Sequence, residues 1–278
     1  MGGRVTAADR WREQLAAWAI PEDVLAAAPE SPYGFATECF RRRGASAPDA
    51  EPTPTTRRAL EVLPAGGTLL DVGVGGGGTS IPLAGRAGLI VGVDAQPDML
   101  EGFLANAAAA GVAARAVTDA WPDATADVEI ADVVLAGHVF YNTSDLPPFV
   151  RALHDHARRR VVVELTANHP LDWMRDLWLR FHALERPLGP TADDAASVLT
   201  DLGYEVGRED RVVAGRHGSG GFAHRADAIH SVRKRLCLPA DRDEDIAAAL
   251  GDRLRQLDDL WDVGPPERTV VTLWWDRA

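Results

Sequence analysis

Short apolar runs alternate with amphipathic stretches through the middle of the chain. The runs are rich in Val, Leu, Ile and Ala, which is typical of strands that are buried on both faces. The stretches between them have the 3.6-residue spacing of helices. The pattern predicts strands at 68–72, 89–93, 115–118, 132–136 and 160–165, with crossover helices at 97–110 and 145–157. Strands and helices in this alternation form a parallel, doubly wound α/β sheet.

The two flanks of this region are helical in pattern. Trp11, Leu15 and Trp18 recur at helical spacing near the start of the chain. Further helices are predicted at 36–43, after a cap at Thr53, and at 171–184, 192–202, 222–236 and 244–260, ahead of a last strand at 269–275. We therefore expect an N-terminal helical cap over 1–56 and a main domain over 57–278, with a helical insertion at about 168–190.

The composition narrows the functional classes. The chain has 278 residues and a formal charge of -12, and its basic residues are spread along the sequence, which disfavours binding to nucleic-acid phosphates. Cys39 and Cys237 stand far apart and form neither a disulfide framework nor a metal cluster. No run reaches the ~18 apolar residues of a membrane helix. We expect a cytoplasmic protein that binds no nucleic acid, membrane or metal; its oligomeric state stays open.

The strongest local signal is a glycine-rich turn between a strand and a helix. Gly73, Gly75 and Gly78 fit the spacing of a nucleotide-binding turn, where glycine lets the backbone approach a ligand closely. Asp94, at the end of the next strand, is placed to accept hydrogen bonds from ribose hydroxyls. Asp71 stands just before the turn, where a carboxylate would repel a pyrophosphate but would suit a cationic ligand. This disfavours NAD.

These residues resemble the class I S-adenosylmethionine-dependent methyltransferases. The Asp71-x-Gly73-x-Gly75-x-Gly77 segment is similar to the first motif of that family, and 118–121 to its adenine-binding segment. The resemblance implies a Rossmann-like, seven-stranded, mostly parallel sheet with S-adenosyl-L-methionine as cofactor. It implies that the cofactor is bound by Asp71, Gly73, Val74, Gly75, Gly77, Asp94, Ala95, Asp119, Ala120, Trp121 and His138. The Gly-Gly that many relatives carry before the fifth strand is Arg158-Arg159-Arg160 here, which leaves the subfamily open.

The site of the methyl acceptor is less sharply defined. His138 follows the fourth strand and is the best candidate for a general base, with Tyr141 close behind it as a second catalytic candidate; a packing or cofactor-binding role for His138 is the alternative. The acceptor is expected to contact the N-terminal helices and the insertion. There Trp173, His169 and His182 lie off the apolar stripe that marks the core and are the better candidates for substrate contact. Tyr33 and Phe35 are interpreted either as a lid over the cofactor or as a packing contact of the N-terminal helices. The loop at 216–224 is interpreted as solvent-exposed, with a mobile loop near the site as the alternative.

We interpret the chain as a methyltransferase acting on a small-molecule acceptor, with oxygen favoured over nitrogen. The segment after the fourth strand has neither the Asp/Asn-Pro-Pro-Tyr sequence of enzymes that methylate exocyclic amines of bases nor the Pro-Cys pair of enzymes that attack cytosine. Two alternatives stay open at this point. One is an NAD(P)-dependent oxidoreductase, which the glycine spacing favours and Asp71 disfavours. The other is a non-catalytic regulatory module that binds S-adenosylmethionine.

Overall fold

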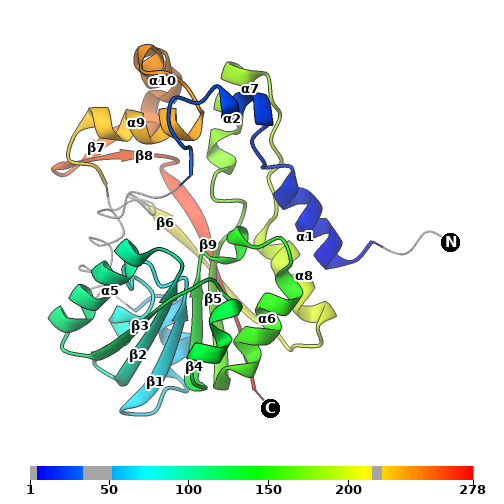
Figure 1. Cartoon of the computed structure of the whole chain (residues 1–278), viewed down its shortest axis with the longest axis vertical. Helices are drawn as coiled ribbons and strands as arrows, with labels where there is room; N and C mark the ends of the chain where they lie inside the picture. The colour runs from blue at the N-terminus through cyan, green and yellow to red at the C-terminus, as the bar shows by residue number, and fades with distance from the viewer. Residues whose placement is uncertain (1–4, 34–51, 215–220, 278) are drawn as a thin grey trace.

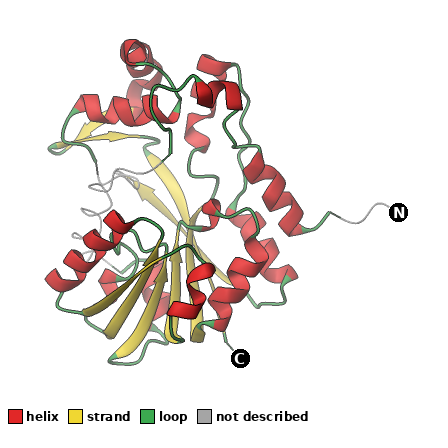
Figure 2. Cartoon of the chain, in the orientation of Figure 1, coloured by secondary structure: helices red, strands yellow, loops and turns green. Residues whose placement is uncertain are grey.

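The computed structural model describes residues 5–33, 52–214 and 221–277 (Figure 1). Phe35, the helix predicted at 36–43 and most of the 216–224 loop lie outside these ranges. Within them, no helix has both the length and the apolar character to cross a lipid bilayer. Figure 2 shows the division into a twisted sheet flanked by helices and a smaller group of helices with a hairpin.

Seven strands form the main sheet in the order β3-β2-β1-β4-β5-β9-β6. The parallel strands β1 to β5 pair with one another, and β9 runs antiparallel between β5 and β6. The bounds are β1 Gly67–Val72, β2 Ala87–Asp94, β3 Ala113–Thr118, β4 Ala131–Gly137, β5 Ala157–Thr166, β6 Gly207–Ala214 and β9 Glu267–Asp276. This confirms the predicted seven-stranded, mostly parallel sheet of the Rossmann-like type. The sequence pattern did not locate β6, because charged residues occupy this edge strand.

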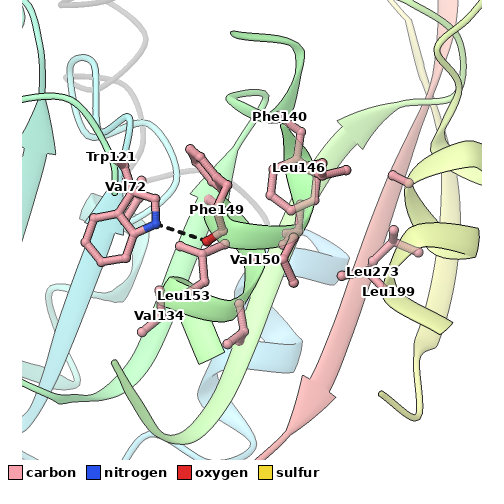
Figure 3. Close-up of a cluster of buried hydrophobic side chains, with 14 of the residues drawn as sticks. Val72, Trp121, Val134, Phe140, Leu146, Phe149, Val150, Leu153, Leu199 and Leu273 are labelled. Atoms are coloured by element: carbon pink, nitrogen blue, oxygen red, sulfur yellow. Dashed lines mark hydrogen bonds between the residues drawn. The ribbon is translucent and has the colours of Figure 1, made fainter. Parts of the chain in front are cut away.

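Helices cover both faces of the sheet. On one face, α1 (Ala7–Ala16), α6 (Leu146–Asp155) and α8 (Ala192–Asp201) pack over a cluster that includes Phe149 and Val134, part of which Figure 3 shows. On the other, α4 (Pro54–Leu60) and α5 (Pro97–Ala109) pack over a second cluster that includes Leu135 and Phe103. Burying each such side chain contributes about 1.5–3 kcal/mol. The Thr53 side chain caps α4 as predicted.

A third apolar cluster lies apart from the sheet. It joins α2 (Glu22–Ala26), α7 (Arg175–His182), α9 (Arg225–Arg235) and α10 (Asp243–Leu250), beside the hairpin of β7 (Leu254–Leu257) and β8 (Leu260–Val263). Met174, Leu177 and Trp178 are buried in it, as the stripe at 171–184 predicts. We call residues 18–33, 168–190 and 221–264 the cap. This set differs from the N-terminal helical cap over 1–56 that the sequence predicts. Figure 1 shows the elements of the cap together above the sheet.

The topology places the cap at one edge of the sheet. Its middle segment follows the carboxyl end of β5, and its last segment lies between the end of β6 and the start of β9. Because β9 is antiparallel, its start lies at the same edge as the carboxyl ends of the other strands. Ligands of doubly wound sheets bind outside these carboxyl ends. The cap therefore stands over the ligand-binding edge.

Three local predictions were wrong. The glycine turn leads into a short 3₁₀ turn at Ile81–Leu83, not an α-helix. The helix expected at 171–184 is a 3₁₀ turn at Asp172–Met174 followed by α7, which ends at left-handed Ala183. The helix expected at 244–260 stops at Leu250, before Gly251 with φ +52°, and its second half forms the hairpin. The division at residues 56 and 57 stays a prediction.

Candidate active site

Three adjacent strands bring polar groups together at the carboxyl edge. Asp71 in β1 pairs with Leu135 in β4, and Gly137, two residues further, pairs with Glu164 in β5. Side chains two residues apart point to the same face of a sheet. Asp71 and Glu164 therefore share one face, on either side of Gly137. A Cβ on Gly137 would collide with Thr79 Oγ1, so the space above this glycine is already taken by Thr79.

The turn after β1 requires glycine for steric reasons. Gly73, Gly75 and Gly77 have φ values of +69°, +52° and +84°, a region that L residues with side chains rarely adopt. A Cβ on Gly73 would also stand 2.7 Å from the Val139 side chain. The turn is anchored because the amides of Gly73 and Val74 both donate to the Val93 carbonyl. The sequence prediction of a tight ligand-binding turn thus has a physical basis in the backbone.

Asp71 is fully buried, and neither of its carboxylate oxygens has a hydrogen-bond partner among the described residues. Burial raises the pKa of Asp71 to about 7. The nearby hydroxyl of Ser80 lowers this pKa, and the negative charges of Asp94 and Glu164 raise it further. A buried carboxylate without a partner is costly to keep charged. The position therefore suits a ligand that brings a cationic hydrogen-bond donor.

Asp94 binds the glycine turn with one carboxylate oxygen and the backbone that follows it with the other. Its Oδ2 accepts from the Gly75 amide at 3.0 Å, and its Oδ1 accepts from the Gln96 amide at 3.0 Å. The carboxylate therefore fixes the shape of the turn, and its remaining lone pairs can still accept hydrogen bonds from a ligand. The neighbouring Ala95 is exposed.

The segment after β3 divides into an exposed part and a buried part. Asp119 and Ala120 are exposed, and Asp119 Oδ1 accepts from the Ala120 amide at 2.7 Å. Trp121 is buried, and its indole Nε1 donates to the Phe149 carbonyl at 3.2 Å, as Figure 3 shows. Its ring thus packs under α6, which leaves Asp119 and Ala120 as the exposed residues of this segment.

His138 stands at the end of β4 in a left-handed backbone conformation, with φ +58°. Its amide donates to the Glu164 carbonyl at 2.7 Å, and its ring Nε2 lies 3.1 Å from Glu164 Oε1. The imidazole is about a quarter exposed. Most of the ring is therefore enclosed by the protein, and the exposed part is accessible to a ligand. Sequence reasoning missed Glu164. Its signal was an acid inside the apolar run of the fifth strand.

Tyr141 lies in the core rather than at the open edge. It is buried, its hydroxyl donates to the Thr166 carbonyl at 2.7 Å, and burial raises its pKa. Its ring stacks on Trp11 with centroids 5.7 Å apart. These contacts favour a packing role that joins α1 to the end of β5.

The three cap candidates also make internal contacts. His169 is buried and stacks on Trp18 with centroids 4.1 Å apart, and burial lowers its pKa to about 3. His182 Nε2 lies 2.6 Å from the Leu236 carbonyl. Trp173 packs against the cap cluster. His169 also contacts the Tyr141 ring edge-on, with centroids 5.5 Å apart. Tyr33 is more than half exposed.

The chain is similar to known methyltransferase domains in one segment of its sequence and in its fold. Residues 69–160, from β1 to β5, match the family model described as a methyltransferase domain. The YcgJ protein of Bacillus subtilis is 14% identical, with a TM-score of 0.51, 80% of this chain covered and 97% of that one. A protein of Bacillus halodurans that is described as a putative methyltransferase is 10% identical, with a TM-score of 0.51, and the match covers 80% of this chain and 98% of that one. No curated protein matches the chain.

The residues fit S-adenosylmethionine on structural grounds. The buried Asp71 carboxylate, which has no hydrogen-bond partner within residues 5–33, 52–214 and 221–277, suits an ammonium group, and the glycines of the turn leave its backbone open to a ligand. A pyrophosphate would face that carboxylate instead, so the NAD(P) alternative does not fit. By its matched segment and its sheet, the chain is similar to methyltransferase domains and has the class I methyltransferase fold.

Proposed function

We propose that the protein transfers a methyl group to an oxygen atom of a small-molecule acceptor, with His138 as general base. The observation that carries this proposal is the placement of His138. Its ring stands at the carboxyl end of β4, next to the turn that follows β1, and is partly exposed. Nitrogen acceptors are second, because an unprotonated amine needs no base.

The cofactor residues keep the roles that the sequence indicated. Asp71 binds the ammonium group, Gly73, Val74, Gly75 and Gly77 line the methionine part, and Asp94 with Ala95 holds the ribose. Asp119 and Ala120 face the adenine, with Trp121 supporting them from the core. When bound, the cofactor supplies an electrophilic methyl group on a sulfonium. What the chain adds is alignment, exclusion of water and removal of a proton.

The cap supplies the acceptor side in this proposal. It stands over the carboxyl edge and is built from three segments, so different acceptors can be accommodated without altering the sheet. The spread of arginines along the chain supports a small molecule rather than a nucleic acid, and the two distant cysteines support a cytoplasmic location.

The first experiment tests the cofactor. Calorimetry with S-adenosylmethionine, S-adenosylhomocysteine, NAD and NADP should give binding for the two adenosyl compounds alone. A ligand at about 100 times its dissociation constant should also stabilise the fold by roughly 2.7 kcal/mol. Binding of a nicotinamide cofactor in their place would overturn the proposal.

The second experiment tests the acceptor atom. Methyl-labelled cofactor is incubated with separate pools of phenols, alcohols, carboxylic acids and amines, and the product is identified by mass spectrometry and NMR. We expect label in an oxygen-bearing pool, and its loss in His138→Asn but not in the control His224→Ala, an exposed histidine of the cap. Asparagine tolerates the left-handed backbone at 138. Cofactor binding without transfer to any pool would favour a regulatory module.

A further inference from the structure

Glu164 is a buried carboxylate that the predicted site did not include. It lies in β5 among apolar residues, and its Oε2 accepts from the Thr55 hydroxyl at 2.7 Å. Thr55 Oγ1 is also 2.8 Å from Thr272 Oγ1. A hydroxyl has one proton to donate, so Thr272 donates to Thr55 while Thr55 donates to Glu164. This chain of hydroxyls from α4 and β9 fixes the carboxylate from behind.

The front of the same residue contacts His138 at two points. The Glu164 carbonyl accepts from the His138 amide at 2.7 Å, and Glu164 Oε1 lies 3.1 Å from His138 Nε2. A left-handed conformation is unfavourable for histidine by about 1 kcal/mol or more and persists where surrounding contacts enforce it. Glu164 thus holds both the backbone and the ring of His138.

The contact at Nε2 also determines which ring nitrogen is free. Glu164 Oε1 lies 3.1 Å from Nε2, and its negative charge disfavours a lone pair on that nitrogen, which favours the tautomer with the proton on Nε2. The neutral ring then has its lone pair on Nδ1. A carboxylate beside Nε2 also stabilises the imidazolium that forms when Nδ1 accepts a proton, which is the logic of an acid–histidine pair in other enzymes.

We propose that Glu164 is the positioning residue for His138, keeping Nδ1 free as the base toward an acceptor hydroxyl. This inference rests on the proposed function. In the proton transfer the acceptor O–H bond breaks, the proton joins Nδ1, and the electron pair stays on the acceptor oxygen. Thr55 and Thr272 hold the carboxylate in place.

The test is an NMR measurement of the histidine rings in the whole protein saturated with S-adenosylhomocysteine. Long-range proton–nitrogen spectra distinguish the two neutral tautomers and the doubly protonated ring, and the His138 signals are identified by their loss in His138→Asn. We compare the wild type with Glu164→Gln. The matched control is Glu209→Gln, which changes an exposed-edge carboxylate that is also opposite Thr272.

In the wild type we expect the neutral ring of His138 to be protonated at Nε2. In Glu164→Gln, the fraction of the neutral ring that is protonated at Nδ1 should rise at least about threefold, because the negative charge that disfavours a lone pair on Nε2 is lost. The control should leave this fraction unchanged. A wild-type ring protonated at Nδ1, or the same Nδ1-protonated fraction in Glu164→Gln, would overturn the proposal.

Two further outcomes separate this inference from the proposed function. If calorimetry shows no binding of S-adenosylhomocysteine, the proposed function fails, and the spectra of the free protein still decide the Glu164–His138 pairing. If Glu164→Gln weakens cofactor binding tenfold or more while the His138 spectrum is unchanged, Glu164 serves the cofactor instead. Should Glu164→Gln fold poorly, Thr55→Ala, which removes one hydrogen bond to the carboxylate, is expected to shift the ring signals in the same direction by a smaller amount.

Discussion

The carboxyl edge of the sheet and the cap each contain a buried ionisable side chain, and burial shifts the pKa values of these two side chains in opposite directions. Asp71, at the edge of the sheet, is buried without a hydrogen-bond partner among the described residues, and burial raises its pKa to about 7. His169, in the cap, is buried between Trp18 and Tyr141, and burial lowers its pKa to about 3. Burial thus favours the neutral form at both positions, but Asp71 stands beside the glycine turn, whereas His169 is packed between aromatic rings.

In the proposed function, the two sites differ in how they relate stability to binding. The Asp71 carboxylate is unfavourable in the free protein and becomes favourable when the ammonium group of the cofactor binds, so stability is given up there for binding. At His169 in the cap, the aromatic contacts with Trp18 and Tyr141 are already made within the chain. Four variants test this comparison, beginning with the largest expected change in stability.

Trp178→Ala tests whether the cap is a separate unit. Trp178 is buried, and Arg186 lies over its ring at 4.3 Å, so removal should destabilise the cap by about 3–5 kcal/mol. Hydrogen exchange should become faster in α7, α9 and α10 while β1 and β4 stay protected. An equal loss of protection in β1 would contradict the separation, and Leu135→Ala, in the sheet core, is the control that should affect the whole sheet.

Gly73→Ala tests the turn. The positive φ and the 2.7 Å approach to Val139 act together, and we expect a loss of about 2–4 kcal/mol in the free energy of unfolding. Gly111→Ala is the matched control, because its φ is +69° as well but nothing lies within 4 Å of the added Cβ. It should cost about 1 kcal/mol. Equal losses in urea unfolding would mean that steric contact at the turn is unimportant.

Asp71→Asn should separate stability from binding. Cofactor affinity should fall roughly 30- to 150-fold, equivalent to about 2–3 kcal/mol, because a charged partner for the ammonium is lost. The free protein should become more stable at pH 8. The folded pKa of Asp71 lies above the unfolded value of 3.8, so its contribution is complete below pH 3.8 and is lost as pH rises through about 7.

That loss amounts to at most about 4 kcal/mol, and the asparagine variant should not show it. The measurements are calorimetry and denaturant unfolding between pH 5 and pH 8. Unchanged cofactor affinity in Asp71→Asn would remove the central support for the ammonium site.

His169→Gln should reduce the sensitivity of the protein to acid. The folded pKa of His169 lies below the unfolded value of 6.5, so the folded state is fully favoured above pH 6.5 and loses stability as pH falls toward 3. At pH 5 the loss is about 2 kcal/mol. Unfolding curves at pH 7 and pH 5 should therefore differ more for the wild type than for the variant, and parallel curves would show that another group controls the acid response.

The sequence predicted the sheet edge better than the cap, for physical reasons. Local signals define the glycine turn, because a tight ligand-binding turn demands particular residues at adjacent positions. The cap combines three distant segments around Met174, Ile229 and Leu250, and no local pattern reports such long-range packing. The same limit applies to Glu164, whose role depends on Thr55 and Thr272, contributed by a helix and a strand far from it in sequence.

Local propensity also failed where tertiary contacts or special backbone angles decide. The run at 244–260 is interrupted by Gly251 and by a turn at Asp258 with φ +53°, and these produce the hairpin. Trp121, which the family resemblance places in the adenine-binding segment, donates its indole N–H to the Phe149 carbonyl in α6, a long-range contact that no local pattern reports.

The antiparallel placement of β9 has a consequence for synthesis on the ribosome. Within the described sheet, β6 pairs with β9 alone, and β9 also covers one side of β5. In a nascent chain that has emerged only as far as residue 264, one side of β5 is therefore unpaired and β6 lacks the strand that it pairs with. Open strand edges favour association between chains. We expect nascent chains that end before residue 267 to need protection by chaperones. The sheet is completed only when β9 has been synthesised and pairs with β5 and β6.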